Sequence, residues 1–151
     1  MVCYDKNVMA NYKLYFDGSC GPKNPGGTAK YGFALFKDGR REPIELGHGT
    51  IGTGPGMTNN LAEFTALKHG LARFLYEVGP SGGNVLHCIG DSQLVIKIMN
   101  RIWHASADNA YFPACVAVEN LCDEVFLGGN VVDFKWIPRE QNQQADDLSK
   151  I

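Results

Sequence analysis

Four acidic residues stand at separate points of this chain, each within a local pattern that predicts where its carboxylate lies. They are Asp17, Glu63, Asp91 and Asp146. Asp17 and Asp91 each end an apolar run that predicts a strand, whereas the other two lie near the starts of predicted helices. Two strand ends and two helix starts can bring these groups together, and four converging carboxylates cannot all stay ionised without cations. A divalent-metal site is the leading interpretation.

The chemistry of such a site follows from its ligands. Mg²⁺ takes near-octahedral oxygen ligands and keeps waters that a substrate phosphate can replace. Two such ions about 4 Å apart are typical of sites that activate a water and stabilise the leaving oxygen in phosphodiester cleavage. Taken alone, each acid has a plainer interpretation: Asp146 could be an early-helix acid favoured by the helix dipole. Its neighbour Asp147 points about 100° away on a helix and is expected to be a surface charge.

The elements that must position these groups alternate along the chain without an internal repeat. Strands are predicted at 12–17, 31–39, 43–51, 85–91 and 131–138. Helices are predicted at 59–78, capped by Thr58 or Asn59, at 92–102, at 111–127 and from about 142 onward. This order predicts an α/β fold with a five-stranded mixed sheet, an antiparallel meander followed by parallel strands, and flanking helices. The ends of the first and fourth strands can then lie side by side at the centre of the sheet.

Length and charge limit the function classes. The chain has 151 residues, 44% of them hydrophobic, and a formal net charge of −2. One domain over 1–151 is expected, with a flexible extension at 1–10. The charge argues against binding through a large basic field. No long apolar run or basic-then-apolar leader is present, so a cytoplasmic protein without membrane contact is expected, and a monomer.

Cysteine and histidine patterns give no second metal site. The five cysteines form no C-x-x-C pair, and the four histidines show no paired spacing. Reduced thiols packed in the core are expected for Cys88, Cys115 and Cys122. Cys20 is the exception, because it lies near Asp17 in the sequence.

Four motifs carry a resemblance to a known family. They are YFDGSCGPKNPGG, MTNNLAEFTAL, IGDSQLV and WIPREQNQQADDLS. In this order and at this spacing, over almost its whole length, the chain resembles a type 1 ribonuclease H. The resemblance implies a ribonuclease H-like fold and endonucleolytic cleavage of the RNA strand of RNA–DNA hybrids. It implies two Mg²⁺ ions per site, with Mn²⁺ as a possible substitute, and products with 3′-hydroxyl and 5′-phosphate ends.

The resemblance also assigns residues. It implies four metal-binding catalytic carboxylates, which are Asp17, Glu63, Asp91 and Asp146. It implies substrate-binding or groove-lining positions at Ser19, Cys20, Asn24, Thr58, Asn59, Asn60, Gln93 and Arg139. A separate physical argument favours polar side chains at these positions. Distinguishing RNA from DNA requires contacts to 2′-hydroxyls across a wide minor groove, and Asn and Gln side chains are suited to such contacts. The plainer interpretation is that Thr58 and Asn59 merely cap the helix, and the two roles are compatible.

Three features depart from the family pattern. Many members have a His in a flexible loop before the last carboxylate, whereas residues 138–141 here read PREQ. Arg139 cannot act as a general base near neutral pH, so it is expected to orient a phosphate or aid product release. Residues 105–110 offer no basic protrusion, and Leu61 stands where some relatives have an Arg. The resemblance is therefore to a subgroup lacking both the protrusion and the His-containing loop.

Two other function classes stay open on the sequence alone. One is a different enzyme on the same fold, such as a transposase or integrase core or a 3′–5′ exonuclease. The other is a non-catalytic nucleic-acid binding module, which would be expected if a carboxylate were missing; none is.

Overall fold

A computed structural model of the protein describes residues 10–79 and 82–151, and the expected extension lies outside them except for Ala10. The strands are β1 (Ala10–Gly21), β2 (Thr28–Lys37), β3 (Glu45–Thr53), β4 (Asn84–Gly90) and β5 (Val131–Trp136). The helices are α1 (Asn59–Val78), α2 (Gln93–Met99), α3 (Phe112–Leu127) and α4 (Gln143–Leu148), with a 3-10 helix at Arg139–Gln141. The strands form one sheet in the order β3-β2-β1-β4-β5. The predicted five-stranded mixed sheet with flanking helices is confirmed.

The centre of the sheet brings two distant segments together. β1 pairs antiparallel with β2 and parallel with β4, and β4 pairs parallel with β5. The β1–β4 pairing runs from Ala10 beside Asn84 to Phe16 beside Gly90. Residues 17 and 91 therefore come directly after the last paired residues of these two central strands.

The predicted end of the first strand at Asp17 is wrong. β1 continues to Gly21, because Asp17 to Gly21 still pair with residues 28–32 of β2 after the pairing with β4 has ended. Asp17 thus lies inside a strand, but at the point where β4 turns away from it. The Asp17 carboxylate still lies at the carboxyl end of β4, beside Asp91, as predicted from the order of the strands.

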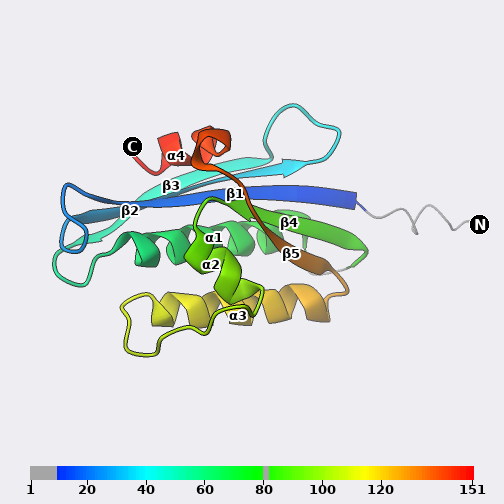
Figure 1. Ribbon diagram of the computed structural model, residues 1–151. Helices are drawn as coiled ribbons and strands as arrows, with labels where there is room; N and C mark the ends of the chain where they lie inside the picture. Colours follow the sequence, from blue (N-terminus) through cyan, green and yellow to red (C-terminus); the bar gives the residue numbers. More distant parts are fainter. Residues whose placement is uncertain (1–9, 80–81) are drawn as a thin grey trace, which may run out of the picture.

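Helix α1 forms the main layer over the sheet. Its residues Phe64, Leu67, Leu71 and Phe74 are fully buried, because their spacing places them on one stripe of the helix. Thr58 caps the helix, since its Oγ1 accepts a hydrogen bond from the N–H of Leu61 at 3.0 Å. Figure 1 shows α1, α2 and α3 on one face of the sheet and α4 on the other.

Helix α4 is fastened to its face of the sheet by three side-chain hydrogen bonds. Asn142 donates to the carbonyl of Phe16 at 2.9 Å, and Ser19 donates to the carbonyl of Ser149 at 2.7 Å. Lys30 donates to the carbonyl of Ile151 at 3.1 Å. These bonds hold the end of the chain across β1 and β2.

The described cysteines are free thiols, as expected. Cys88 and Cys115 are buried, and burial raises the pKa of the Cys88 thiol well above its usual range. Burial also raises the pKa of Cys122 to about 12, so these thiols stay protonated and unreactive. Within residues 10–79 and 82–151, no helix is long and apolar enough to cross a membrane.

Candidate active site

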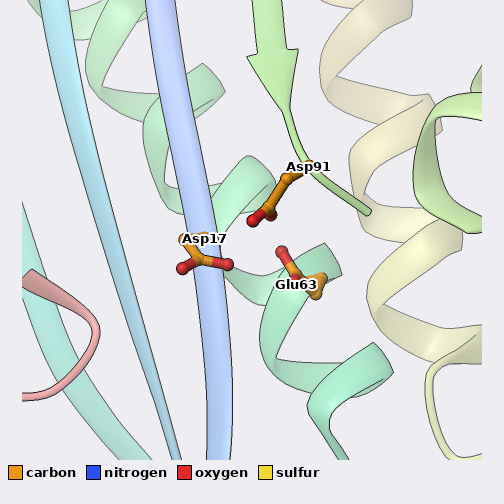
Figure 2. A group of neighbouring side chains, drawn as sticks. All are labelled: Asp17, Glu63 and Asp91. Atoms are coloured by element: carbon orange, nitrogen blue, oxygen red, sulfur yellow. The ribbon is translucent and has the colours of Figure 1, made fainter. Parts of the chain in front are cut away.

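Three of the four predicted metal ligands converge in space. Asp17, Glu63 and Asp91 each offer a carboxylate oxygen, and these oxygens lie within 4.8 Å of one another. Figure 2 shows them pointing toward a common point from β1, α1 and the end of β4. Asp17 and Glu63 are buried, at 4% and 6% exposure, while Asp91 is half-buried. The group is open to a ligand on the side of Asp91.

Glu63 is positioned by a close contact between β1 and α1. The N–H of Gly18 donates to Glu63 Oε1 at 3.1 Å and to Asp17 Oδ1 at 2.9 Å. A Cβ atom at residue 18 would stand 2.3 Å from the backbone of Ala62 and Glu63. Only glycine allows the strand this close to the helix, so Gly18 fixes both carboxylates. Gly18 follows Asp17 directly in the sequence but was not among the predicted site residues.

Asp91 is held at the end of β4 by residues on either side. The indole N–H of Trp136 donates to the backbone carbonyl of Asp91 at 3.1 Å. Ser92, the next residue, caps α2 by accepting from the N–H of Val95 at 3.2 Å. The chain therefore changes direction sharply at Asp91 with its backbone anchored. The hydrogen bond of Trp136 thus gives this side chain a role in positioning Asp91.

The electrostatics of the group favour bound cations. Burial raises the pKa of Asp17 to about 7, and the nearby charge of Asp91 adds to this. Burial likewise raises the pKa of Glu63 well above its usual range, with further contributions from Asp17 and Asp91. Without a cation, these acids tend to keep protons, because desolvation and like charges disfavour ionisation. A divalent ion would take the place of those protons.

The donor set suits a hard divalent ion. All three groups are carboxylates, the ligands that Mg²⁺, Mn²⁺ and Ca²⁺ prefer. The thiol of Cys20 does not join them, since its Sγ lies 3.2 Å and 3.4 Å from the carbonyls of Lys23 and Met57. The residues present thus fit the metal that the sequence predicts.

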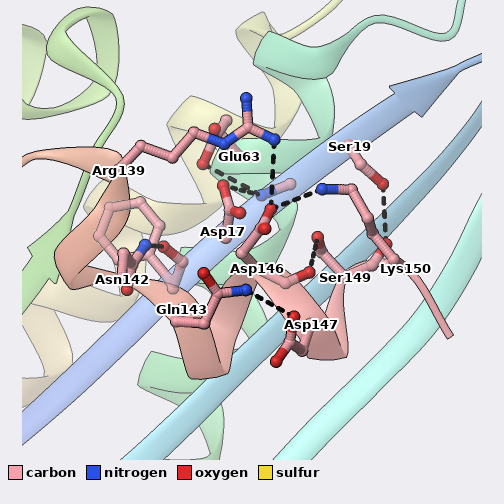
Figure 3. A network of polar contacts seen from close by, with 12 residues as sticks. Asp17, Ser19, Glu63, Arg139, Asn142, Gln143, Asp146, Asp147, Ser149 and Lys150 are labelled. Atoms are coloured by element: carbon pink, nitrogen blue, oxygen red, sulfur yellow. Dashed lines mark hydrogen bonds and ion pairs between the residues drawn. The ribbon is translucent and has the colours of Figure 1, made fainter.

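Asp146 lies beside this group but has different partners. Its Oδ1 is 2.7 Å from Lys150 Nζ and 3.6 Å from the Arg139 guanidinium (Figure 3). Burial of Asp146 favours the protonated acid, but the hydrogen bond from Lys150, a hydrogen bond with Asp17 and the charges of both cations outweigh it and lower its pKa. Asp146 is therefore an ionised carboxylate held in ion pairs, outside the group of three.

These side chains lie in one polar groove of about 550 Å³. All the predicted site residues except Thr58 line it, which are Asp17, Ser19, Cys20, Asn24, Asn59, Asn60, Glu63, Asp91, Gln93, Arg139 and Asp146. Thr58 serves as the cap of α1 instead. A larger hollow of about 620 Å³ lies between β3 and α1, but its lining includes only one carboxylate, Glu45. A site that uses several carboxylates as metal ligands is therefore expected in the smaller groove.

Lys150 also lines the groove and was missed by the sequence analysis. Its spacing to Asp146 gave a usable signal, because residues four apart on a helix face each other and pair when their charges are opposite.

A second missed feature is the pair Asn24 and Asn59. Asn24 donates to Asn59 Oδ1 at 2.8 Å and accepts from the Asn59 N–H at 3.0 Å. The loop after β1 is thereby fastened to the start of α1.

Arg139 is placed to assist rather than to carry out proton transfer. On the RNA–DNA hybrid that the sequence resemblance implies, replacing Arg139 by Ala should lower the cleavage rate moderately, by about tenfold, because a charge-assisted contact to phosphate is lost. The effect stays moderate since the Arg139 side chain is 70% exposed to solvent. The pH profile of kcat should keep its shape, since a guanidinium does not titrate near neutrality. Steady-state rates across pH for both proteins test this. A shifted apparent pKa in a folded Arg139→Ala protein would contradict the assignment.

Comparison with known proteins identifies the family of the chain and agrees with the fold. The chain belongs to the reverse transcriptase-like family, whose model matches residues 28–151. Its structure is similar to RNase H1 of the archaeon Halobacterium salinarum NRC-1, with 28% identity, a TM-score of 0.72 and coverage of 91% of this chain and 93% of that one.

Two further solved structures share the fold. The N-terminal RNase H domain of a Mycobacterium tuberculosis protein has 23% identity and a TM-score of 0.76, over 91% of this chain and 95% of that one. LC11-RNase H1, solved in complex with an RNA/DNA hybrid, has 23% identity and a TM-score of 0.74, over 91% and 92%. The resemblance to type 1 ribonuclease H is confirmed at the level of family and fold, whereas the subgroup stays a prediction.

Proposed function

We propose that this protein is a metal-dependent endoribonuclease that hydrolyses the RNA strand of RNA–DNA hybrids, leaving 5′-phosphate and 3′-hydroxyl ends. The observation that carries the proposal is the group of three carboxylate oxygens within 4.8 Å at the edge of a polar groove. The hybrid bound to LC11-RNase H1 supports the choice of substrate.

In this proposal, Asp17, Glu63 and Asp91 hold the first divalent ion, and Asp146 with Asp17 completes a second site. Bound Mg²⁺ or Mn²⁺ would supply an activated water and charge stabilisation at the leaving oxygen. The protein itself contributes rigidity, because Gly18 and Trp136 fix the carboxylates before substrate arrives.

The RNA strand is recognised by the amides along the groove. Asn60 and Gln93 line the groove, as do Asn24 and Asn59, which are hydrogen-bonded to each other. Amide groups can both donate to and accept from a 2′-hydroxyl, which DNA lacks. Selection for RNA is therefore assigned to these amides rather than to charge.

A cleavage assay on end-labelled substrates tests the function. RNA–DNA hybrid, duplex RNA, duplex DNA and both single strands would be incubated with Mg²⁺, Mn²⁺ or EDTA. Internal cuts in the RNA of the hybrid alone, abolished by EDTA, are expected. Stepwise removal of terminal nucleotides would indicate an exonuclease, and cuts in duplex DNA would indicate a transposase or integrase type of enzyme. Binding without cuts would indicate a non-catalytic module.

Hybrid binding should be weak and should depend only shallowly on salt. The cations that line the groove are Arg139 and Lys150, and both are paired with Asp146. We expect about two to four phosphate contacts, each contributing roughly −0.9 to the slope of log affinity against log salt. Lys23, Lys30, Lys97 and Arg101 are further candidates to supply them. Titration of an Asp91→Asn protein with fluorescent hybrid at several salt concentrations measures the slope. A slope steeper than about −6 would point to a further basic surface or an accessory partner that contacts the hybrid.

A further inference from the structure

Asp146 is bound by two cationic side chains through the same oxygen. Lys150 Nζ lies 2.7 Å from Asp146 Oδ1, and the Arg139 guanidinium lies 3.6 Å from it. The other three acids form a group of their own, within 4.8 Å. Three carboxylates therefore form a group of their own, whereas Asp146, which shares a hydrogen bond with Asp17, is paired with two cations.

Lys150 is built into this position. It stands four residues after Asp146, just past the end of α4, and the hydrogen bonds from Asn142 to Phe16 and from Ser19 to Ser149 fasten the chain to β1 on either side of this helix. Figure 3 shows its side chain reaching back to Asp146. The Asp146 side chain is 14% exposed and the Lys150 side chain 50%, so water reaches the contact mainly from the side of the lysine. A backbone fastened at both ends of α4 keeps the ammonium group within reach of the carboxylate.

We propose that Lys150 is a positioning residue that holds Asp146 in the metal-free protein and sets the affinity for a second divalent ion. This inference rests on the proposed function, in which Asp146 serves that ion. One carboxylate oxygen cannot keep a 2.7 Å contact to an ammonium group and bind a divalent ion at full strength, because the two cations repel each other. The three-carboxylate site carries no such competition, so the two ions bind with separate affinities.

The test measures metal binding without nucleic acid. Metal-free protein is titrated with Mn²⁺ into the millimolar range, by calorimetry and by electron paramagnetic resonance of free Mn²⁺. Lys150→Met should tighten the second ion about fivefold, the upper value for a half-exposed ion pair, and leave the first within about twofold. Lys150→Arg should behave like the parent protein, because it keeps the charge.

Lys30→Met is the matched control. Lys30 lies in β2, and its ammonium group also reaches the last residues of the chain, but it contacts the carbonyl of Ile151 and not Asp146. An equal tightening in Lys30→Met would show a general charge effect and overturn the inference. So would an unchanged second affinity in Lys150→Met.

A second pair of variants isolates the contact. In an Asp146→Asn background, Lys150→Met should have no effect on Mn²⁺ binding, and circular dichroism of each variant verifies the fold. A parent protein that cleaves hybrid, combined with an unchanged second affinity in Lys150→Met, would overturn this inference alone. Tightening as expected in a parent protein that cleaves no hybrid would leave the inference standing and remove the proposed function.

Discussion

Replacing Asp91 by Asn should lower the rate of hybrid cleavage by about a thousandfold or more, while hybrid binding largely survives. A metal site contributes several kcal/mol of transition-state stabilisation, and each 1.4 kcal/mol corresponds to about a factor of ten in rate. Asp91 is the half-buried member of the three-carboxylate group and lies on its open side. Removing its charge also reduces the repulsion of phosphate, so affinity for hybrid should not fall with activity.

Single-turnover cleavage in Mg²⁺, with hybrid affinity measured separately, distinguishes the two effects. Asp147→Asn is the matched control, because it removes the same charge one residue from Asp146. Asp147 accepts a hydrogen bond from Gln143 within α4, does not line the groove, and should change the rate little. An Asp91→Asn protein that cleaves hybrid at nearly the parental rate would show that the site is wrong.

The arrangement of the central strands could be predicted because its signals are local. Apolar runs before Asp17 and Asp91, and the apolar stripe from Phe64 to Phe74, are readable within a few residues. The end of β1 could not be read in this way. Residues 18–21 are Gly-Ser-Cys-Gly, a typical turn sequence, but pairing with β2 extends them as a strand. Tertiary pairing outweighed local preference there.

The site residues show the same contrast between local patterns and contacts over long distances in the chain. The four acids could be selected because each follows a local pattern, and the structure places three of them together. The bonds that position them join residues far apart in the chain, such as Asn142 with Phe16 and Ser19 with Ser149. No local pattern predicts such a pairing. Lys150 is different, because its contact with Asp146 spans only four residues.

The metal-free protein should lose stability as the pH rises from about 5 to 8, and Asp17→Asn should remove much of this loss. In the folded protein, burial and the charge of Asp91 raise the pKa of Asp17 to about 7, from 3.8 for the free side chain. The folded state therefore keeps a proton that the unfolded chain has released, and its stabilising effect is complete below pH 3.8 and lost as the pH passes the folded pKa.

The loss should amount to about 3 kcal/mol, because the interval from pH 5 to a folded pKa of about 7 spans two units at about 1.4 kcal/mol each. Glu63, whose pKa is raised in the same direction, should add to this loss of stability.

Urea unfolding in EDTA at several pH values measures the effect. At pH 8 the Asp17→Asn protein should be more stable than the parent, whereas Asp147→Asn should match it. Saturating Mn²⁺ should stabilise the parent much more than Asp17→Asn, since binding to the folded state alone raises stability. A parent protein equally stable at pH 5 and pH 8 in EDTA would mean that Asp17 is ionised across this range without a cation, and that the acidic group is better solvated than its burial implies.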